Sequence, residues 1–241
     1  MDPPLFRVAL RRRLRAPVYD IDGHCPSCGQ PLDRWGDHAL VCACSGDRTI
    51  RHNAVRNIVF AESMVGGLRP EKEKGGLLPD RPGTDGLPSG LGRRPADLWL
   101  PRCMSGQGEA LDFAVTSGMR ADVFRVAAVS PETVFHRYER HKREYKHTAD
   151  SCEAAGFRFT PMVLEAHGGG WSSLARGTFD WIARQTAAVQ FEDPSTTALK
   201  MAQRIFVSLH RGNARAILKR AVVLEGCAQP DGWDDPGDEW Q

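Results

Sequence analysis

Two aspartates stand inside apolar runs that each predict a buried strand. Asp112 interrupts "EALDFAVT", residues 109–116, and Asp97 lies fifteen residues upstream in "RPADLWL". Acids on neighbouring strands can hold a divalent cation such as Mg²⁺ or Mn²⁺ against a phosphate oxygen. Such a cation lowers the pKa of a bound water and neutralises charge that develops on the phosphate. We therefore predict that Asp97 and Asp112 are catalytic residues that bind Mg²⁺ or Mn²⁺.

Chemistry at such a site is helped by a lysine that orients the nucleophile or stabilises charge. Position 114, two residues after the second acid, is an alanine, so the lysine has to come from another segment. Lys142 lies at the edge of an apolar stripe that includes Tyr138 and Tyr145, from which a long side chain can reach the sheet. Lys146 lies further round and is the weaker candidate. A solvated Lys142 is the alternative.

A second set of residues has the types and spacing of zinc ligands: Cys25, Cys28, His38 and Cys42. Three thiolates and one imidazole make a closed tetrahedral site for structural Zn²⁺. Gly29 can supply the backbone conformation that a knuckle needs after its second cysteine. Two alternatives remain open at this point, because Cys44 could replace Cys42 and His24 could serve as a ligand.

Charge is segregated along the chain although the net charge is only +2. Residues 7–15 hold five arginines and no acid, and residues 136–147 hold five Lys or Arg and three His against two Glu. Residues 231–241 hold five acids and no base. Basic segments of this kind predict contact with a polyanion, for which the acidic tail would compete. Solvated helix faces and a solubilising tail are the alternative.

The chain has no feature that places it in or across a membrane. No apolar run reaches the roughly 18 residues of a transmembrane helix, and the N-terminus lacks the apolar region of a secretory signal. Seven cysteines, several clustered near a histidine, favour metal binding over disulfides. We expect an intracellular protein with no membrane association.

Periodicity and turn residues predict the elements that position these side chains. The expected order is an irregular basic arm at 1–23, the Cys/His cluster at 24–46, a helix within 46–67, a loop at 74–94, strands at 95–100 and 109–116, a helix at 130–156, a strand at 157–165, and helices at 171–190 and 196–225. The first helix is expected to bury Ile50, Ile58 and Val65, and the last to be interrupted near Gly212. This order predicts an α/β fold with a mixed sheet flanked by helices.

The predicted organisation has three parts. Residues 1–46 form the basic arm and zinc knuckle, residues 47–225 form the α/β domain with its C-terminal helices, and residues 226–241 form the acidic tail.

The order of the motifs resembles a known family. "CPSCG", "GDHALVC", "RHN", "RPAD", "LDFAVT" and "HKREY" follow one another as in the C-terminal part of non-LTR retrotransposon polyproteins, over roughly residues 20–165. That region carries a restriction-like endonuclease of the PD-(D/E)XK superfamily behind a Cys-Cys-His-Cys zinc knuckle. The resemblance implies a restriction-endonuclease-like fold, DNA as substrate, RNA of an element as a further candidate partner, and a nuclear location.

The resemblance also implies roles for individual residues. Asp97 and Asp112 would be the metal-binding acids and Lys142 the lysine that has moved to the following helix, with Tyr145 beside it. The sequence departs from the family pattern in one place, since "RPAD" has one residue more than Arg-Pro-Asp. Glu73 resembles the additional acid of many such nucleases. Glu71 or Glu62 could fill that role, and a solvated glutamate is the alternative for each.

The triplet "RHN" resembles the basic element that opens the family's helix. Together with its neighbours it gives a set of candidate nucleic-acid-binding residues: Arg48, Arg51, His52, Arg56 and Tyr145. Arg48, His52 and Arg56 are four residues apart and share one helix face, which could contact phosphates. The same face could instead support the zinc module.

The function expected from the sequence is a Mg²⁺-dependent DNA endonuclease with a structural zinc knuckle. Two alternatives from other classes stay open. One is an inactive nucleic-acid-binding protein on the same fold, and the other is a zinc-stabilised interaction module with no nucleic-acid role.

Overall fold

The fold is described here from a computed structural model, which covers residues 1–80, 93–120, 122–168 and 170–221. The helices are α1 Pro3–Arg13, α2 Asp37–Val41, α3 Asp47–Val65, α4 Phe124–Val129, α5 Pro131–Glu144, a 3₁₀ turn at Tyr145–His147, α6 Thr148–Ala154, α7 Ser173–Gln190 and α8 Pro194–Ala221. The strands are β1 Gly23–His24, β2 Pro31–Leu32, β3 Glu71–Lys72, β4 Leu98–Leu100, β5 Glu109–Thr116 and β6 Arg158–Glu165. The predicted acidic tail and most of the predicted loop at 74–94 lie outside the described residues.

The main sheet has four strands in the order β3-β4-β5-β6. β3, β4 and β5 pair antiparallel, whereas β5 and β6 run parallel from the pair Glu109–Arg158 to the pair Thr116–Glu165. The helical α5 and α6 form the connection that a parallel pair requires. The predicted α/β fold with a mixed sheet is therefore confirmed.

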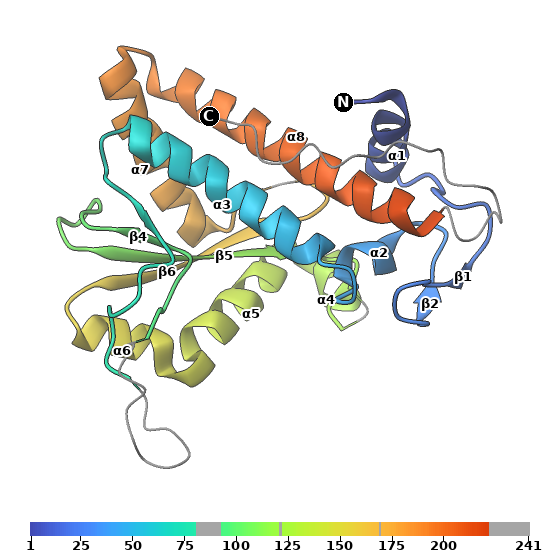
Figure 1. Cartoon of the computed structure of the whole chain (residues 1–241), viewed down its shortest axis with the longest axis horizontal. Coiled ribbons are helices and arrows are strands. Elements are labelled where there is room, and N and C mark those ends of the chain that lie inside the picture. Colours follow the sequence, from blue (N-terminus) through green and yellow to red (C-terminus); the bar gives the residue numbers. More distant parts are fainter. Residues whose placement is uncertain (81–92, 121, 169, 222–241) are drawn as a thin grey trace.

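Alternation along β5 separates the two faces of the sheet. Leu111 and Phe113 enter the main core with residues of α3, α7 and α8. Ala110 packs with Cys152 of α6 on the opposite face. Asp112 shares that second face because side chains two apart point the same way. Figure 1 shows the result, with α3, α7 and α8 above the sheet and α5 and α6 below it.

The N-terminal segment packs against the C-terminal helix. Leu5 and Val8 of α1, Leu32 of β2 and Ile217 of α8 belong to one hydrophobic cluster, which spans the boundary predicted at residue 46. Gly36 ends the loop before α2 with φ 74°, and a Cβ there would lie 3.0 Å from Ile217 side-chain atoms. Glycine is therefore required at this position by backbone conformation and by space together.

The prediction of an irregular basic arm at 1–23 is wrong, because residues 3–13 form α1. Leu5, Val8 and Arg12 recur at helical spacing and are buried against α8 and the zinc module. The many arginines of this segment made its apolar stripe hard to recognise from the sequence.

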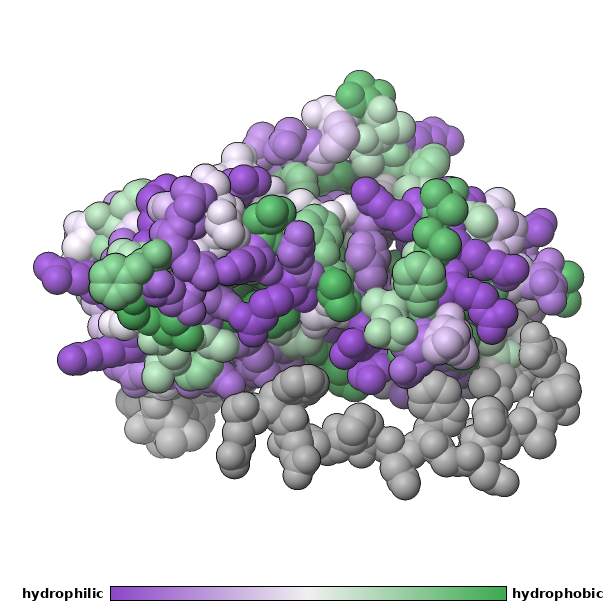
Figure 2. Space-filling model, turned by 90° about the horizontal axis from the view of Figure 1, so that it is seen from above, coloured by the Kyte–Doolittle hydropathy of each residue, from purple (hydrophilic) through white to green (hydrophobic). Residues whose placement is uncertain are grey.

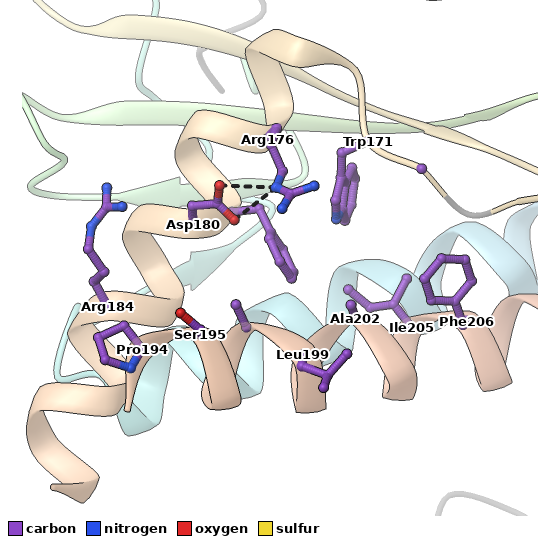
Figure 3. Close-up of a pocket in the computed structure, with 13 residues that line it drawn as sticks. Trp171, Arg176, Asp180, Arg184, Pro194, Ser195, Leu199, Ala202, Ile205 and Phe206 are labelled. Atoms are coloured by element: carbon purple, nitrogen blue, oxygen red, sulfur yellow. Dashed lines mark hydrogen bonds and ion pairs between the residues drawn. The ribbon is translucent and has the colours of Figure 1, made fainter. Parts of the chain in front are cut away.

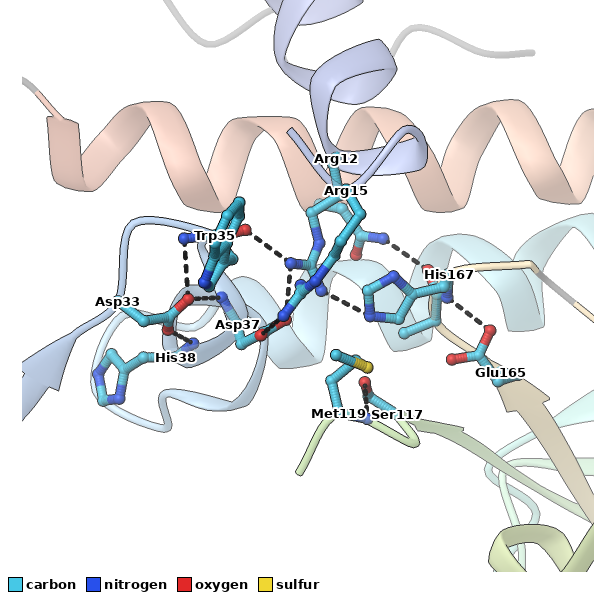
Figure 4. A network of polar contacts seen from close by, with 12 residues as sticks. Arg12, Arg15, Asp33, Trp35, Asp37, His38, Ser117, Met119, Glu165 and His167 are labelled. Carbon is cyan, nitrogen blue, oxygen red and sulfur yellow. Dashed lines mark hydrogen bonds and ion pairs between the residues drawn. The ribbon is translucent and has the colours of Figure 1, made fainter. Parts of the chain in front are cut away.

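Arg12 is the centre of a buried polar network (Figure 4). Its guanidinium donates to Trp35 O at 2.7 Å, lies 2.7 Å from Asp37 Oδ1 and donates to His167 Nε2 at 2.6 Å. Arg15 forms a second ion pair with Asp37. The network joins α1 to the zinc module and to the turn after β6. It also pairs the Asp37 carboxylate with two arginines.

Three details of the predicted helices are wrong. The helix at 130–156 is divided, because Lys146 and His147 have φ near 52° and 53° and end α5 before α6 begins. The last helix is not interrupted at Gly212, since α8 is continuous and packs between α3 and α7. In α3 the buried side chains include Val55 and Val59, whereas Ile50 and Val65 are exposed, so the predicted stripe was displaced by one residue.

Within the described ranges, no helix is both long enough and apolar enough to cross a bilayer. The surface seen from the α8 side is mainly hydrophilic, with smaller groups of hydrophobic residues between the polar ones (Figure 2).

His167 should make the folded protein sensitive to acid. Burial, and then the charge of Arg12, lower its pKa to about 4. The unfolded chain, with a pKa near 6.5, therefore binds the proton more readily than the folded chain between about pH 4 and 6.5, and stability falls as the pH falls through this window. We expect His167→Gln to reduce the loss of unfolding free energy between pH 7 and 5 by on the order of 1–2 kcal/mol. Denaturant titrations at both pH values would measure it.

The matched control is His136→Gln, an exposed histidine on α5. This variant should show the same dependence of unfolding free energy on pH as the wild-type protein. An unaltered pH dependence in His167→Gln would show that this histidine is not the group responsible.

Candidate functional site

The two aspartates predicted from the sequence lie side by side on the sheet. Asp97 directly precedes β4 and its N–H donates to Leu111 O at 3.0 Å, which places it next to the middle of β5. Its Oδ2 accepts the N–H of Phe113 at 2.8 Å. The carboxyl groups of Asp97 and Asp112 are within hydrogen-bonding reach of each other. The register of β4 on β5 thus assembles the acidic pair.

Lys142 reaches this pair from α5. Its Nζ lies 2.9 Å from Asp112 Oδ2 and 3.1 Å from Oδ1. The side chains of Lys142 and Asp112 are 26% and 16% exposed, so the ion pair is partly screened from solvent. The predicted approach of Lys142 to the sheet is therefore present, and Lys146 instead lies in the 3₁₀ turn with its Nζ 5.2 Å from the Tyr145 ring.

The environment separates the pKa values of the two acids. Burial raises the pKa of Asp112 to about 6, against the opposing effect of Lys142 and with a further contribution from Asp97. Burial alone would raise the pKa of Asp97, but the hydrogen bond and charge of His52, together with the N–H of Phe113 and the interaction with Asp112, outweigh burial and lower this pKa. Divergent pKa values in adjacent carboxyl groups are typical of functional sites. A cation between the two carboxylates would favour the ionised form of both.

His52 belongs to this site rather than to a free basic surface. Its Nε2 lies 3.0 Å from Asp97 Oδ2, and this hydrogen bond raises the pKa of His52. Its ring also meets Phe113 edge-on. The sequence placed His52 among nucleic-acid contacts, and the structure puts it directly behind a predicted metal ligand.

The backbone of Glu73 lies next to Asp97, but the Glu73 side chain binds other partners. Its N–H donates to Asp97 O at 2.9 Å, whereas its carboxylate binds Arg56 at 2.7 Å and Arg94 at 2.5 Å. Glu71 pairs with Lys74, and Glu62 pairs with Arg204. In the part of the chain that the structure describes, no third acidic side chain joins Asp97 and Asp112 in a ligand cluster.

The remaining predicted nucleic-acid contacts are divided among different environments. Arg51 is 5% exposed and donates to Asn213 Oδ1 at 2.7 Å and to Leu40 O at 2.8 Å, so it supports the packing of α3 on α8 and α2. Arg56 is also buried. Arg48 and Tyr145 are exposed and keep polar groups at the surface.

The four predicted zinc ligands converge. The donor atoms of Cys25, Cys28, His38 and Cys42 all lie within 4.8 Å of one another. The Cys25 and Cys42 sulfurs are 4.0 Å apart, and Cys28 Sγ is 3.2 Å from His38 Nε2. Zn–S bonds of about 2.3 Å in a tetrahedron separate two sulfurs by roughly 3.8 Å, so the set fits Zn²⁺.

The choice of Cys42 is confirmed, since Cys44 and His24 are exposed and outside the group. Gly29 has φ 72°, as its place after the second cysteine predicts. The group is therefore consistent with structural zinc.

Arg220 of α8 lies behind the thiolates and was missed in the sequence. It is fully buried, and its Nη1 is 3.0 Å from Asp47 Oδ2 at the start of α3. Burial opposes its charge, but interactions with Cys42, Asp47 and Cys25 outweigh burial and raise the pKa of Arg220. A cation here offsets thiolate charge and fixes ligand orientation. The feature of the sequence that could have identified Arg220 is its position on the apolar stripe of α8, four residues after Ala216.

One cavity lies away from both centres. About 450 Å³ in volume, it lies between α7 and α8 and is lined by apolar side chains such as Trp171, Leu199 and Phe206 (Figure 3). One carboxylate, Asp180, lines it and is bound to Arg176 at 2.9 Å. It offers no cluster of catalytic or ligating groups.

Comparison with known proteins gives no assignment. The chain matches no protein-family model, and a search of the curated proteins finds no match.

Cys28→Ser should lose zinc. The substitution removes one of four ligands from a closed site, and zinc binding contributes directly to folding of such modules. We expect the purified variant to contain well under one zinc per chain by elemental analysis and to unfold at a lower temperature. Cys44→Ser, which changes an exposed cysteine outside the cluster, should retain zinc. Equal zinc content in the two variants would contradict the assignment.

Proposed function

We propose that this protein is a DNA endonuclease that depends on Mg²⁺ or Mn²⁺, built on a restriction-endonuclease-like α/β domain with a zinc knuckle at its N-terminus. The observation that carries the proposal is the convergence of Asp97, Asp112 and Lys142 from three separate segments, with Lys142 Nζ 2.9 Å from Asp112. Two acids that can hold a divalent ion and a lysine that can stabilise developing charge suit metal-assisted phosphodiester hydrolysis.

The donor set suits the proposed ion. Asp97 and Asp112 supply carboxylate oxygens, the ligands that Mg²⁺ and Mn²⁺ prefer, and both are partly buried, which favours a cation that offsets their charge. When bound, the ion would supply polarisation of the phosphate and a more acidic water. His52 would orient Asp97 through the 3.0 Å hydrogen bond, as groups behind metal ligands commonly do.

Lys142 would act on the substrate. Its ammonium now pairs with Asp112, and a metal ion on that carboxylate would leave the ammonium available to a phosphate oxygen. A cation held in a partly desolvated position stabilises developing negative charge more strongly than one in bulk water. Lys142 on α5 would thus take the role of the lysine that is absent at position 114.

An inactive nucleic-acid-binding protein is the second candidate, and a specific observation favours it. Both acids are already paired with protein cations, Asp97 with His52 and Asp112 with Lys142, and Glu73 is paired with two arginines. Such internal pairing could outlast the loss of metal binding. Metal-dependent cleavage separates this candidate from the first, and salt-sensitive DNA binding separates both from an interaction module without nucleic acid.

Asp112→Asn should abolish cleavage. The substitution keeps the shape of the side chain and removes the charge that would hold the metal, so we expect nicking of supercoiled plasmid with Mg²⁺ or Mn²⁺ to fall by about 100-fold or more. EDTA should stop nicking by the wild-type protein. Asp150→Asn, an exposed aspartate on α6, is the matched control and should nick normally. Nicking that persists in Asp112→Asn would exclude Asp112 from the site, and DNA binding without nicking by the wild-type protein would favour the inactive candidate.

Lys142→Met should separate catalysis from binding. The methionine fills the space of the lysine stem but cannot neutralise phosphate charge, so nicking should fall by on the order of 100-fold or more. DNA affinity, measured by fluorescence anisotropy in EDTA, should change little. Lys146→Met, one turn further along the chain, should keep most of the activity. Equal losses in the two variants would show that Lys142 has no special place in the reaction.

A further inference from the structure

A second, smaller cavity opens at the C-terminal end of β5. It has a volume of about 210 Å³ and lies where the ends of α2, α3 and β5 approach α5. Its polar lining residues are Arg48, Arg51, Thr116, Ser117, Arg120 and Tyr138. The volume would hold several water molecules, at about 30 Å³ each, and is therefore large enough for a small anionic group.

Positive charge dominates this cavity. Three arginines line it, and none of the lining residues is acidic. Arg48 is exposed and makes no ion pair with another described residue. Arg120 pairs with Asp122 at 2.8 Å, in a solvent-exposed pair that contributes little energy and that a stronger anion can replace.

Arg51 provides a second and independent observation. It is 5% exposed and makes no ion pair with a described carboxylate, and its Nε donates to no acceptor in the described chain. Burial, and then the charge of Arg48, lower the pKa of Arg51 to about 10. A buried cation without a carboxylate partner is unfavourable, and an anion in the adjoining cavity would compensate for its charge.

The other polar groups are hydroxyls that can donate to an anion. Ser117 Oγ accepts the N–H of Met119 at 3.1 Å, which leaves its own proton free to donate elsewhere. Thr116 and Tyr138 add two more hydroxyl groups to the lining. Guanidinium and hydroxyl donors without carboxylates are the set that proteins use to bind phosphate oxygens.

The cavity is in line with the acidic pair. Thr116 lies four residues beyond Asp112 on the same face of β5, about 13 Å along the strand. Tyr138 lies one turn before Lys142 on α5, about 6 Å along the helix. Successive phosphates of one DNA strand advance by about 3.4 Å along the duplex axis, so these separations correspond to roughly two to four nucleotides.

We propose that this cavity binds a backbone phosphate of the substrate strand, two to four nucleotides from the phosphate at the acidic pair, with Arg48 and Arg120 as its exposed donors and Arg51 as the buried cation behind them. The identity of the strand rests on the proposed endonuclease function, whereas the phosphate chemistry rests on the cavity itself. The site would set the register of the DNA on the sheet, because phosphate contacts position a strand without reading its sequence.

The test uses the full chain and a short fluorescein-labelled DNA duplex in EDTA, so that binding is measured without cleavage. The variant Arg48→Gln with Arg120→Gln should lower the slope of log Kd against log salt by about 1, as expected for one lost phosphate contact. Both side chains are at the surface, so the thermal unfolding temperature should stay near that of the wild-type protein. Arg184→Gln, an exposed arginine on α7, is the matched control and should keep the wild-type slope.

A single uncharged methylphosphonate, moved along the duplex, locates the contact. One position two to four nucleotides from the cleaved bond should weaken wild-type binding by several-fold and leave the double variant unaffected. The cavity would be rejected as a phosphate site if the wild-type protein and the double variant lost the same affinity at every methylphosphonate position. An unchanged salt slope in the double variant would reject it too, even if cleavage is intact. A reduced slope in a protein that never cleaves would support the cavity and reject the endonuclease.

Discussion

The site depends on one electrostatic constraint, the burial of the Asp112 carboxylate in the middle of an otherwise apolar strand. A carboxylate removed from water is costly unless a cation compensates for it. Lys142 supplies that cation at 2.9 Å, which requires α5 to lie close across the lower face of β5. The helix then ends at Tyr145–His147, and α6 continues in a new direction to cover Ala110 and Phe159. This ion pair is therefore one of the contacts that hold α5 against the sheet.

The zinc module and the C-terminal helix are joined by a second set of buried charges. Arg12 connects α1 to Asp37 and His167, and Arg220 connects α8 to the zinc thiolates and Asp47. Both arginines are almost wholly buried. These contacts hold the zinc module against the end of the sheet where β5 points toward Arg48 and Arg51. The Cys/His cluster is consistent with structural zinc, and α2, which carries His38, also supplies Leu40 and Val41 to the lining of the positive cavity.

Much of the fold was predictable because its signals are local. β5 and β6 are apolar runs bounded by polar turns, α3 and α7 have helical periodicity and glycine or serine at their ends, and the zinc ligands have a specific spacing. The errors arose where a local signal was weak or misleading. Arginines concealed the stripe of α1, and Gly212 suggested a break in α8 that packing against α3 and α7 prevents. The break at Lys146 and His147 carries no glycine or proline, so periodicity passes through it unchanged.

The sequence by itself determined which residues are candidates for chemistry: two acids in apolar strands, a lysine at the edge of a helical stripe, and four potential zinc ligands in order. These depend on residue type and on spacing within one segment, which the chain specifies directly. Only the tertiary structure decided which groups meet. The His52 ring contacts Asp97, and the Glu73 carboxylate pairs with Arg56 and Arg94. Arg51 is buried without a carboxylate partner, and Arg220 lies behind the cysteine side chains. Each of these outcomes depends on contacts between segments that are distant in the sequence. Strand register, helix packing and the free-energy cost of burying charge together determine which of these contacts form.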